Sequence, residues 1–390
     1  MQNIIFFYYF CTQLKERGFL TMKLHIFNPD HDVALASNMD AFTAPHAARE
    51  LRADLGYLPA LWADDGDMVL VDDVSAALES ARRLGSLVHD VLFISHADLC
   101  RVPIDFSTVK VEPWGWNRAL CHYLVSSNAT FRQTVPTAEQ LEDMRKLSSR
   151  TFAATHLLPV LAASHERFVG TSTFFSGDAA QLADRLMADG ERFVLKAPWS
   201  SSGRGLRYVD HDFSDHVEGW CRNLIKKQGG IMIEPQYNKV CDFGMEFMAM
   251  DNGRVAYLGL SLFSTVHGAY TGNIIASEAV KRNMMARYVP LELIDFIQAH
   301  VISLVGSLFK GKYVGPFGID MMVVRMENRE ELCIHPCVEL NLRRTMGHVA
   351  LALTEPQSTA PKQLMHVEYT DKYRLKVSLA GDDLLIPYVL

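Results

Sequence analysis

The sequence lacks the patterns of a disulfide-rich, a membrane-spanning or a nucleic-acid-binding protein. Its seven cysteines are an odd number, widely spaced and without a CxxC pair, which favours reduced thiols over a disulfide framework. No stretch reaches the roughly 20 consecutive apolar residues that span a bilayer. The net charge of -7 offers no basic surface for nucleic acid. We therefore expect a cytoplasmic protein that binds neither nucleic acid nor membrane.

The amino terminus also lacks the features of a targeting signal. The apolar run from Ile4 to Cys11 is too short to cross a bilayer, and neither a basic segment nor a small-residue cleavage site accompanies it. A strand-like run begins after Met22. We therefore interpret residues 1–21 as a non-native or disordered extension.

What is present is an ordinary globular composition, because 49% of the 390 residues are hydrophobic and 21% are charged. This length predicts two or three domains with ample core. Between residues 22 and 124, short apolar runs alternate with helical patterns, which is typical of a small parallel α/β domain.

A histidine and aspartate cluster follows the first predicted strand. It consists of His25, Asp30, His31, Asp32 and His46. One interpretation is a metal-dependent phosphohydrolase, but no later His and Asp residues complete such a ligand set. Another is an ordinary turn, and a third places Asp30 and His31 against an acceptor substrate, because loops after strands of such sheets commonly meet ligands.

The most informative stretch runs from Gly315 to Met346. The apolar segments Phe317 to Met326 and Leu332 to Leu342 flank the polar turn Glu327 to Glu331, which predicts a β-hairpin. Symmetric pairing about that turn places Asp320 opposite Glu339.

Because side chains alternate along a strand, Glu339 and Asn341 share one face of the predicted hairpin. Cross-strand neighbours have Cβ atoms roughly 5 Å apart, so Asp320 joins them. Two carboxylates and an amide oxygen suit Mg²⁺ that also holds substrate phosphates. Arg343 or Arg344, directly after them, could meet a phosphate.

Two other interpretations of this stretch remain open. The acids could belong to a solvated hairpin face, since a short motif match is only a hypothesis. Cys333, His335 and Cys337 alternate on the second strand and could ligate zinc, but they supply only three ligands, and buried cysteine is the commoner case.

A second candidate site precedes the hairpin in the chain. Lys196 ends a predicted strand, and the small-residue loop from Ser200 to Gly205 follows it. Glycines let backbone N–H groups approach phosphate oxygens, and the lysine adds a point charge. The loop is neither a Walker A motif nor a dinucleotide fingerprint, and a plain hairpin turn is the alternative.

Further candidates lie on both sides of that loop. Arg150 begins a helix, where it could reach an anion or simply face solvent. Glu234 to Tyr237 ends a strand at a proline and could present its backbone to an adenine edge. Glu246 could point into a site or lie on the wet face of a sheet. The polar stretch Ser264 to Ser277 is expected to be a long functional loop.

Taken in order, these segments resemble the ATP-grasp superfamily, whose members include D-alanine–D-alanine ligase, biotin carboxylase and carbamoyl phosphate synthetase. No single segment is specific; their order and spacing carry the resemblance, and Glu339-Leu-Asn341 is its sharpest part. It implies an α/β (α+β) fold of two α+β subdomains that clasp ATP, preceded by the smaller parallel α/β domain. The implied limits are 22–124 for the first domain, 125–355 for the ATP-grasp domain with a lid subdomain at about 168–236, and 356–390 for a carboxyl-terminal extension.

The resemblance also implies a role for each matching residue. Arg343, Lys196 and His267 match the catalytic groups, and Asn273 lies with His267 on the substrate side. Asp320, Glu339 and Asn341 match the ligands of Mg²⁺ or Mn²⁺. The nucleotide site is matched by Arg150, Lys196, Ser200, Ser201, Ser202, Gly203, Gly205, Glu234, Gln236, Tyr237 and either Asp242 or Glu246 as the ribose-binding acid.

The implied activity is an ADP-forming ligase that activates a small-molecule carboxylate as an acyl phosphate for attack by an amine or thiol. A homodimer is a further expectation. A small-molecule kinase and a non-catalytic nucleotide-binding protein are the alternatives. The chain departs from the family in its few loop glycines, in Arg204 and in its first domain. The resemblance therefore does not name the substrate.

Overall fold

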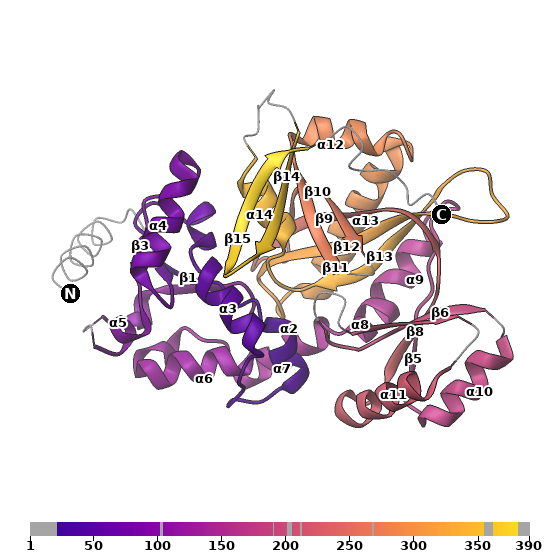
Figure 1. The fold of residues 1–390 in the computed structure, drawn as a ribbon, viewed down its shortest axis with the longest axis horizontal. Helices are drawn as coiled ribbons and strands as arrows, with labels where there is room; N and C mark the ends of the chain where they lie inside the picture. Colours follow the sequence, from indigo (N-terminus) through magenta and orange to yellow (C-terminus); the bar gives the residue numbers. More distant parts are fainter. Residues whose placement is uncertain are drawn as a thin grey trace. The chain divides into compact units, whose positions relative to one another are not determined.

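The computed structural model describes residues 22–101, 104–189, 191–200, 205–210, 213–266, 269–354 and 362–380, without the side chains of 187–189. The predicted extension at 1–21 lies outside this part of the chain. The chain divides into two compact units, one from the amino terminus to Glu142 together with Val367–Lys376, the other formed by the remainder (Figure 1). The domain limits predicted above stay a prediction.

The first unit contains a four-stranded parallel sheet in the order β3-β2-β1-β4. Parallel strands need crossover connections, and helices supply them. The strands are β1 (Lys23–Ile26), β2 (Met68–Leu70), β3 (Leu92–Ile94) and β4 (Lys110–Pro113). The helices are α2 (His31–Ser37), α3 (His46–Leu55), η1 (Leu58–Leu61), α4 (Val74–Leu84), η2 (Gly85–Leu87), α5 (His96–Arg101), η3 (Phe106–Thr108), α6 (Arg118–Ser127) and η4 (Ala129–Gln133).

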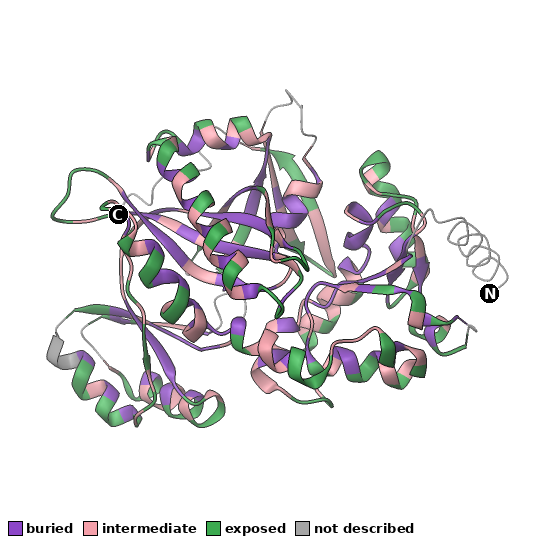
Figure 2. Cartoon of the chain, turned by 180° about the vertical axis from the view of Figure 1, so that it is seen from behind, coloured by how far each residue is buried: buried purple, intermediate pink, exposed green. Residues whose placement is uncertain are grey.

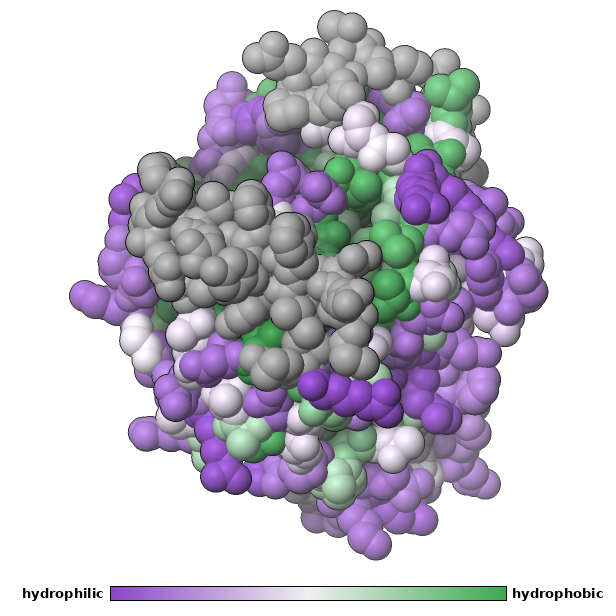
Figure 3. Space-filling model, turned by 90° about the vertical axis from the view of Figure 1, so that its left-hand side faces the viewer, coloured by the Kyte–Doolittle hydropathy of each residue, from purple (hydrophilic) through white to green (hydrophobic). Residues whose placement is uncertain are grey.

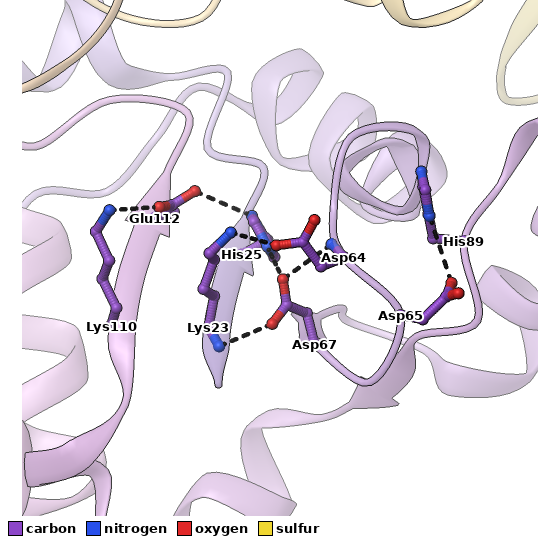
Figure 4. A network of polar contacts seen from close by, with 8 residues as sticks. All are labelled: Lys23, His25, Asp64, Asp65, Asp67, His89, Lys110 and Glu112. Atoms are coloured by element: carbon purple, nitrogen blue, oxygen red, sulfur yellow. Dashed lines mark hydrogen bonds and ion pairs between the residues drawn. The ribbon is translucent and has the colours of Figure 1, made fainter. Parts of the chain in front are cut away.

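A network of polar contacts, with His25 and Asp67 buried at its centre, lies near the starts of the strands in this unit (Figure 4). His25 Nε2 lies 2.9 Å from Asp67 Oδ2, and both side chains are buried. Asp67 also accepts the backbone N–H groups of Lys23 and Asp64. Burial alone would raise the pKa of Asp67, but these hydrogen bonds hold it below its ordinary value. These contacts of Asp67 join β1 to the residues before β2.

Helix α7 (Ala138–Leu147) begins at a capping box formed by Thr137 and Gln140, whose spacing in the sequence is typical of that motif. Thr137 N–H donates to Gln140 Oε1, and Gln140 N–H donates to Thr137 Oγ1. One helical rod follows as α8 (Arg150–Phe152), the π-helical turn η5 (Ala153–Leu157) and α9 (Leu158–Ala163). Ser149 caps its start, because its hydroxyl accepts the N–H of Thr151.

The second unit contains strands β9 to β13 of a seven-stranded sheet whose order is β13-β12-β9-β10-β11-β14-β15, and the last two strands, β14 and β15, include residues of the segment Val367–Lys376 that belongs to the first unit. One face carries the main hydrophobic core, in which Phe243, Met245 and Phe247 of β9 belong to one cluster with residues of α13. Figure 2 shows many strand residues in the colour of buried residues. The strands are β9 (Asn238–Ala249), β10 (Val255–Val266), β11 (Ala269–Ile275), β12 (Gly315–Arg325), β13 (Cys333–Asn341), β14 (Gln363–Tyr369) and β15 (Tyr373–Leu379). The helices are α12 (Glu278–Met285), α13 (Leu291–Phe309) and α14 (Met346–Ala352).

The same unit also contains a four-stranded antiparallel sheet in the order β5-β8-β6-β7. Its core joins one sheet face to two helices through residues such as Leu182, Leu195 and Leu224. The elements are β5 (Thr173–Phe175), α10 (Ala179–Asp189), β6 (Arg192–Lys196), β7 (Leu206–Asp210), α11 (Asp215–Gln228) and β8 (Ile231–Pro235). A parallel α/β unit followed by two antiparallel α+β layers confirms the predicted fold class.

Two expectations were wrong. The polar stretch Ser264 to Ser277 is not a long loop, because β10 continues to Val266 and pairs with β11, as in Ser264 opposite Gly272. Its polar residues alternate along strands, which composition alone does not reveal. The second wrong expectation is that no stretch is long and apolar enough to span a bilayer, because helix α13 is so by length and composition. A third of its most apolar 18 residues are buried in the structure, and the buried residues of this helix belong to the main core.

Hydrophilic residues dominate much of the molecular face drawn in Figure 3, and hydrophobic residues gather in a central strip between them. Scattered exposed apolar residues are normal on protein surfaces, since polar atoms cannot cover a whole fold. We assign no function to this strip.

Candidate active site

The predicted hairpin is confirmed as β12 and β13, and Asp320 lies opposite Glu339. Gly318 lies opposite Asn341, and Asn341 Nδ2 donates a hydrogen bond of 3.0 Å to Asp320 Oδ2. The two acids and the amide therefore gather on one sheet face, as the alternation of side chains requires. The solvated-face interpretation fails for Asn341, which is buried.

The electrostatics of this cluster fit a cation. Asp320 is only half-buried by exposed area, but the chain surrounds it closely. Burial first, and then the neighbouring Glu339 and Glu246, raise the pKa of Asp320 to about 8, against smaller opposing effects of Asn341 and Arg343. Carboxylates this close together repel one another when all are ionised, so they bind a proton or a metal cation between them. The donor set, two carboxylates and an amide oxygen, is of the type that Mg²⁺ prefers.

Arg150 links this cluster to the small sheet. Its Nη2 donates to Glu339 Oε1 at 2.6 Å, and its Nη1 donates to the carbonyl of Ala197 and to Ser200 Oγ at 2.6 and 2.7 Å. The guanidinium is buried, and its Nε has no hydrogen-bond partner. Unmet buried donors are costly, so Nε is a candidate for contact with a ligand oxygen.

Lys196 and Glu234 form a buried ion pair on neighbouring strands of the small sheet. Lys196 Nζ lies 2.5 Å from Glu234 Oε2, and each side chain is 8% exposed. Ser172 Oγ donates to the other oxygen, Oε1, at 3.0 Å. Each of the two basic side chains predicted to bind phosphate is thus paired with an acidic side chain of the predicted site. Arg150 pairs with Glu339, and Lys196 pairs with Glu234.

The predicted phosphate loop begins and ends at described residues that lie together. The N–H of Ala197 donates to the carbonyl of Gly205 at 2.8 Å. A Cβ at Gly205 would lie 2.2 Å from Ser200 Oγ, so only glycine permits this close approach. The candidates Ser201, Ser202 and Gly203 lie outside the described residues, as does Arg204.

The predicted adenine hinge consists of the last two residues of β8, Glu234 and Pro235, and the two residues that follow it. The N–H of Gln236 donates to the carbonyl of Arg192, and the Oε1 of Gln236 is buried without a partner. The ring of Tyr237 packs edge-on against His335, with centroids 5.4 Å apart. Burial raises the pKa of Tyr237, so the phenol stays neutral.

The two candidates for the ribose-binding acid differ in their surroundings. Asp242 is 14% exposed and accepts from Lys239 Nζ and Thr265 Oγ1, each at 2.6 Å. Glu246 is 2% exposed and faces His348 of α14. Only Asp242 has surface to offer a ligand, which favours it for the ribose.

The remaining candidates have mixed outcomes. Arg343 follows the hairpin two residues after Asn341, its Nη1 donates to the carbonyl of Arg344 at 3.0 Å, and its charge lowers the pKa of Asp320. Asn273 is buried on β11, where its Nδ2 donates to Ser261 Oγ at 2.8 Å and its Oδ1 accepts from Tyr270 at 2.6 Å. His267 lies outside the described residues.

Neither alternative metal centre is found. In the described chain, no group of three or more His, Cys, Asp or Glu side chains is arranged to hold a metal ion. This removes the zinc set of Cys333, His335 and Cys337 and the phosphohydrolase set around His25. His335 instead is buried, and burial together with Lys196 lowers its pKa to about 3.

The loops after β1 and β4 lie together within the first unit. Asn28 Nδ2 donates to the carbonyl of Gly115 at 2.9 Å, and Asn117 Nδ2 lies 3.4 Å from His31 Nδ1. Burial raises the pKa of Asp30. These loops follow the carboxyl ends of neighbouring strands at the point where strand order reverses, but contact of Asp30 and His31 with an acceptor stays a prediction.

Sequence reasoning missed several polar residues of the second unit. Ser172 bonds Glu234, Ser261 bonds Asn273, and Thr345 and His348 form a reciprocal cap at the start of α14. The spacing of Thr345 and His348 is that of a capping box with histidine in place of the usual glutamate, so this signal could have been found. The pairs of Ser172 and Ser261 bridge separate strands and leave no local pattern.

No family model and no curated protein sequence matches the chain. Among solved structures, it is similar to N5-carboxyaminoimidazole synthetase from Staphylococcus aureus complexed with ADP, at 11% identity and a TM-score of 0.44, covering 90% of this chain and 84% of that one. It is also similar to the biotin carboxylase domain of Hydrogenobacter thermophilus 2-oxoglutarate carboxylase in complex with MgADP, at 14% identity and a TM-score of 0.47, covering 89% of this chain and 75% of that one. A third similar structure is D-cycloserine synthetase, at 15% identity and a TM-score of 0.41, covering 85% of this chain and 96% of that one. Similarities this distant do not assign an activity, so the site has to be interpreted from its own geometry.

Proposed function

We propose that the protein is an Mg²⁺-dependent, ATP-using ligase that joins a small-molecule carboxylate to an amine or another nucleophile. One observation carries this proposal: Asp320, Glu339 and Asn341 meet on one sheet face, and Arg150 connects Glu339 to the start of the Ser200 loop. This arrangement suits a divalent cation at the acids and a polyphosphate beside the guanidinium. It is also the arrangement that the ATP-grasp resemblance implies.

The proposal gives each described candidate a task. Arg150, Lys196, Ser200 and Gly205 hold the phosphates; Glu234, Gln236 and Tyr237 border the adenine, and Asp242 the ribose. Asp320, Glu339 and Asn341 would hold the cation, which neutralises phosphate charge when bound. Arg343 then lies beside the transferred phosphoryl group, and the ATP-grasp resemblance makes His267 a catalytic candidate.

The reaction begins when an oxygen of the substrate carboxylate attacks the γ-phosphorus of ATP and ADP leaves. Arg343 and Lys196 stabilise the charge that moves onto the departing and transferred oxygens. The nucleophile then attacks the carbonyl carbon of the acyl phosphate, inorganic phosphate leaves, and the nucleophile loses its proton. Exclusion of water protects the acyl phosphate from hydrolysis.

Nucleotide binding is the first test. At a nucleotide concentration of about 100 times Kd, Mg·ATP is expected to stabilise the folded state by about 2.7 kcal/mol and to raise the melting temperature. A flat melting temperature at millimolar Mg·ATP would contradict the proposal.

The reaction class needs a second test. Small acids and amino acids, singly and in pairs, are screened for ATP-dependent phosphate release. A ligase releases free phosphate only when a nucleophile is added to the carboxylate. Phosphate retained on one stable product would instead identify a kinase. A homodimer and a cytoplasmic location stay predictions for the same protein.

A further inference from the structure

A buried carboxylate lies on the polar face of the large sheet without a task in the proposed reaction. Glu246 is 2% exposed, in the middle of β9, where Gly318 of β12 is its cross-strand neighbour. Burial of an unpaired carboxylate is costly, so its surroundings have to explain it. Its Oε2 lies 2.9 Å from His348 Nδ1, and no hydrogen bond reaches that oxygen.

Two glycines make room for this carboxylate. A Cβ at Gly347 would lie 1.9 Å from Glu246 Oε1, and a Cβ at Gly318 would lie 2.5 Å from Oε2. Neither distance is possible for a real side chain, so both neighbouring positions have to be glycine while Glu246 keeps this place. The start of α14 therefore rests directly on the carboxylate.

His348 joins the carboxylate to the cap of α14. Thr345 Oγ1 accepts the N–H of His348 at 3.3 Å, and His348 Nδ1 accepts the N–H of Thr345 at 3.1 Å. His348 Nε2 also lies 3.4 Å from the carbonyl of Phe247 on β9. A helix of seven residues is too short to be stable by itself, so these tertiary contacts fix where it begins.

The segment between the metal-ligand strand and α14 is short and held at both ends. Asn341 ends β13, and its carbonyl accepts the N–H of Arg343 at 2.8 Å in a tight turn. Arg344 follows, and Thr345 is already the cap residue. A shift of the start of α14 would therefore move Arg343, which stands two residues after Asn341 and donates from Nη1 to the carbonyl of Arg344 at 3.0 Å.

We propose that Glu246 and His348 are positioning residues that fix the start of α14 and thereby hold Arg343 beside the transferred phosphoryl group. This inference rests on the function proposed above. It gives Glu246 a role other than ribose binding and adds His348, which the sequence did not single out.

The test compares two nucleotides, so that it needs no knowledge of the substrate. Affinities for Mg·ADP and for Mg²⁺ with the β,γ-imido analogue of ATP are measured by calorimetry. Glu246→Gln is expected to leave ADP affinity within about twofold and to weaken analogue binding about tenfold, as for residues that orient a ligand-binding group. In an Arg343→Ala background, Glu246→Gln is expected to have no further effect, because it acts through Arg343.

The chain supplies a matched control. Asp67 and His25 in the first unit form another buried carboxylate–imidazole pair at 2.9 Å. Asp67→Asn is expected to lower stability similarly and to change neither affinity. If Glu246→Gln does not fold, His348→Gln is measured in its place with the same expected results.

The outcomes separate the two proposals. A wild-type protein that binds neither nucleotide overturns both. Wild-type binding of both nucleotides, with variants that weaken both equally or neither, overturns the positioning role alone. An effect of Glu246→Gln that persists after loss of Arg343 also overturns it.

Discussion

The two faces of the seven-stranded sheet are made by the same strands and differ in almost every physical respect. On β9, Phe243, Met245 and Phe247 are fully buried in the main core. The alternating positions Asp242 and Glu246 point to the other face, where Asp320 and Glu339 also lie. One face therefore stabilises the fold through apolar contact, and the other gathers charges that oppose folding until they are paired.

The difference shows why the sheet tolerates several carboxylates on one face. Because α13 and the aromatic side chains hold the apolar face, the sheet can carry carboxylates on its opposite face. Substitutions on the first face should change stability, and those on the second should change ligand binding. Three predictions test this separation, in order of decreasing effect.

The largest effect is expected for Phe247→Ala. The ring of Phe247 is fully buried and stacks on Phe317 with centroids 5.1 Å apart. Truncation of a buried phenylalanine costs about 3–5 kcal/mol of unfolding free energy, which urea unfolding measures. The variant that remains folded is expected to bind Mg·ADP as the wild type does. Loss of binding by folded protein would show that the faces are not separable.

The second effect concerns Glu339→Gln. The amide keeps an acceptor for Arg150 but removes the charge, so we expect the fold to persist and Mg·ATP turnover to fall about 100-fold or more. Phosphate release and a thermal melt measure the two quantities. Glu330→Gln, in the exposed hairpin turn, is the control and should behave as the wild type. Wild-type turnover in Glu339→Gln would remove the proposed metal role.

The smallest effect is a pH dependence of the metal-free protein. The pKa of Asp320 is about 8 in the fold against 3.8 as the reference value, so the folded state holds this proton more tightly. Stability from this group is present at low pH and is lost as pH rises from about 4 to about 8. We expect wild-type stability to fall by about 1 kcal/mol per pH unit between pH 6 and 8, relative to Asp320→Asn in EDTA.

The raised pKa of Asp320 also predicts how the binding of Mg²⁺ depends on pH. Mg²⁺ competes with the proton on Asp320, so its binding should strengthen over this pH range and release a proton. Parallel stability profiles of the wild type and Asp320→Asn would contradict the raised pKa. Titration calorimetry in two buffers of different ionisation enthalpy measures the released proton.

Much of the fold was predictable, because local patterns persist in it. The hairpin of β12 and β13 and its register followed from two apolar runs about a polar turn, and the capping box of Thr137 and Gln140 followed from spacing alone. The stretch Ser264 to Ser277 was misjudged because its polar side chains belong to two paired strands, β10 and β11. A composition-based prediction sees polarity and cannot see which face it occupies.

The candidate site was predictable in its members and not in its pairings. The sequence indicated Arg150, Lys196, Glu234 and Glu339, but not that Arg150 would bond Glu339 or Lys196 would bond Glu234. These partners are far apart along the chain, and pairing across such distances depends on how sheets pack. The roles of these residues toward a nucleotide stay predictions.

The sequence by itself determined the alternation of side chains along each strand, and with it the meeting of Asp320, Glu339 and Asn341. This was possible because a hairpin is a local structure whose register is set by its turn. Only the tertiary structure decided that Glu246 is enclosed by Gly318, Gly347 and His348 rather than open to a ligand. Burial depends on what packs above a strand, and that is a property of the whole fold.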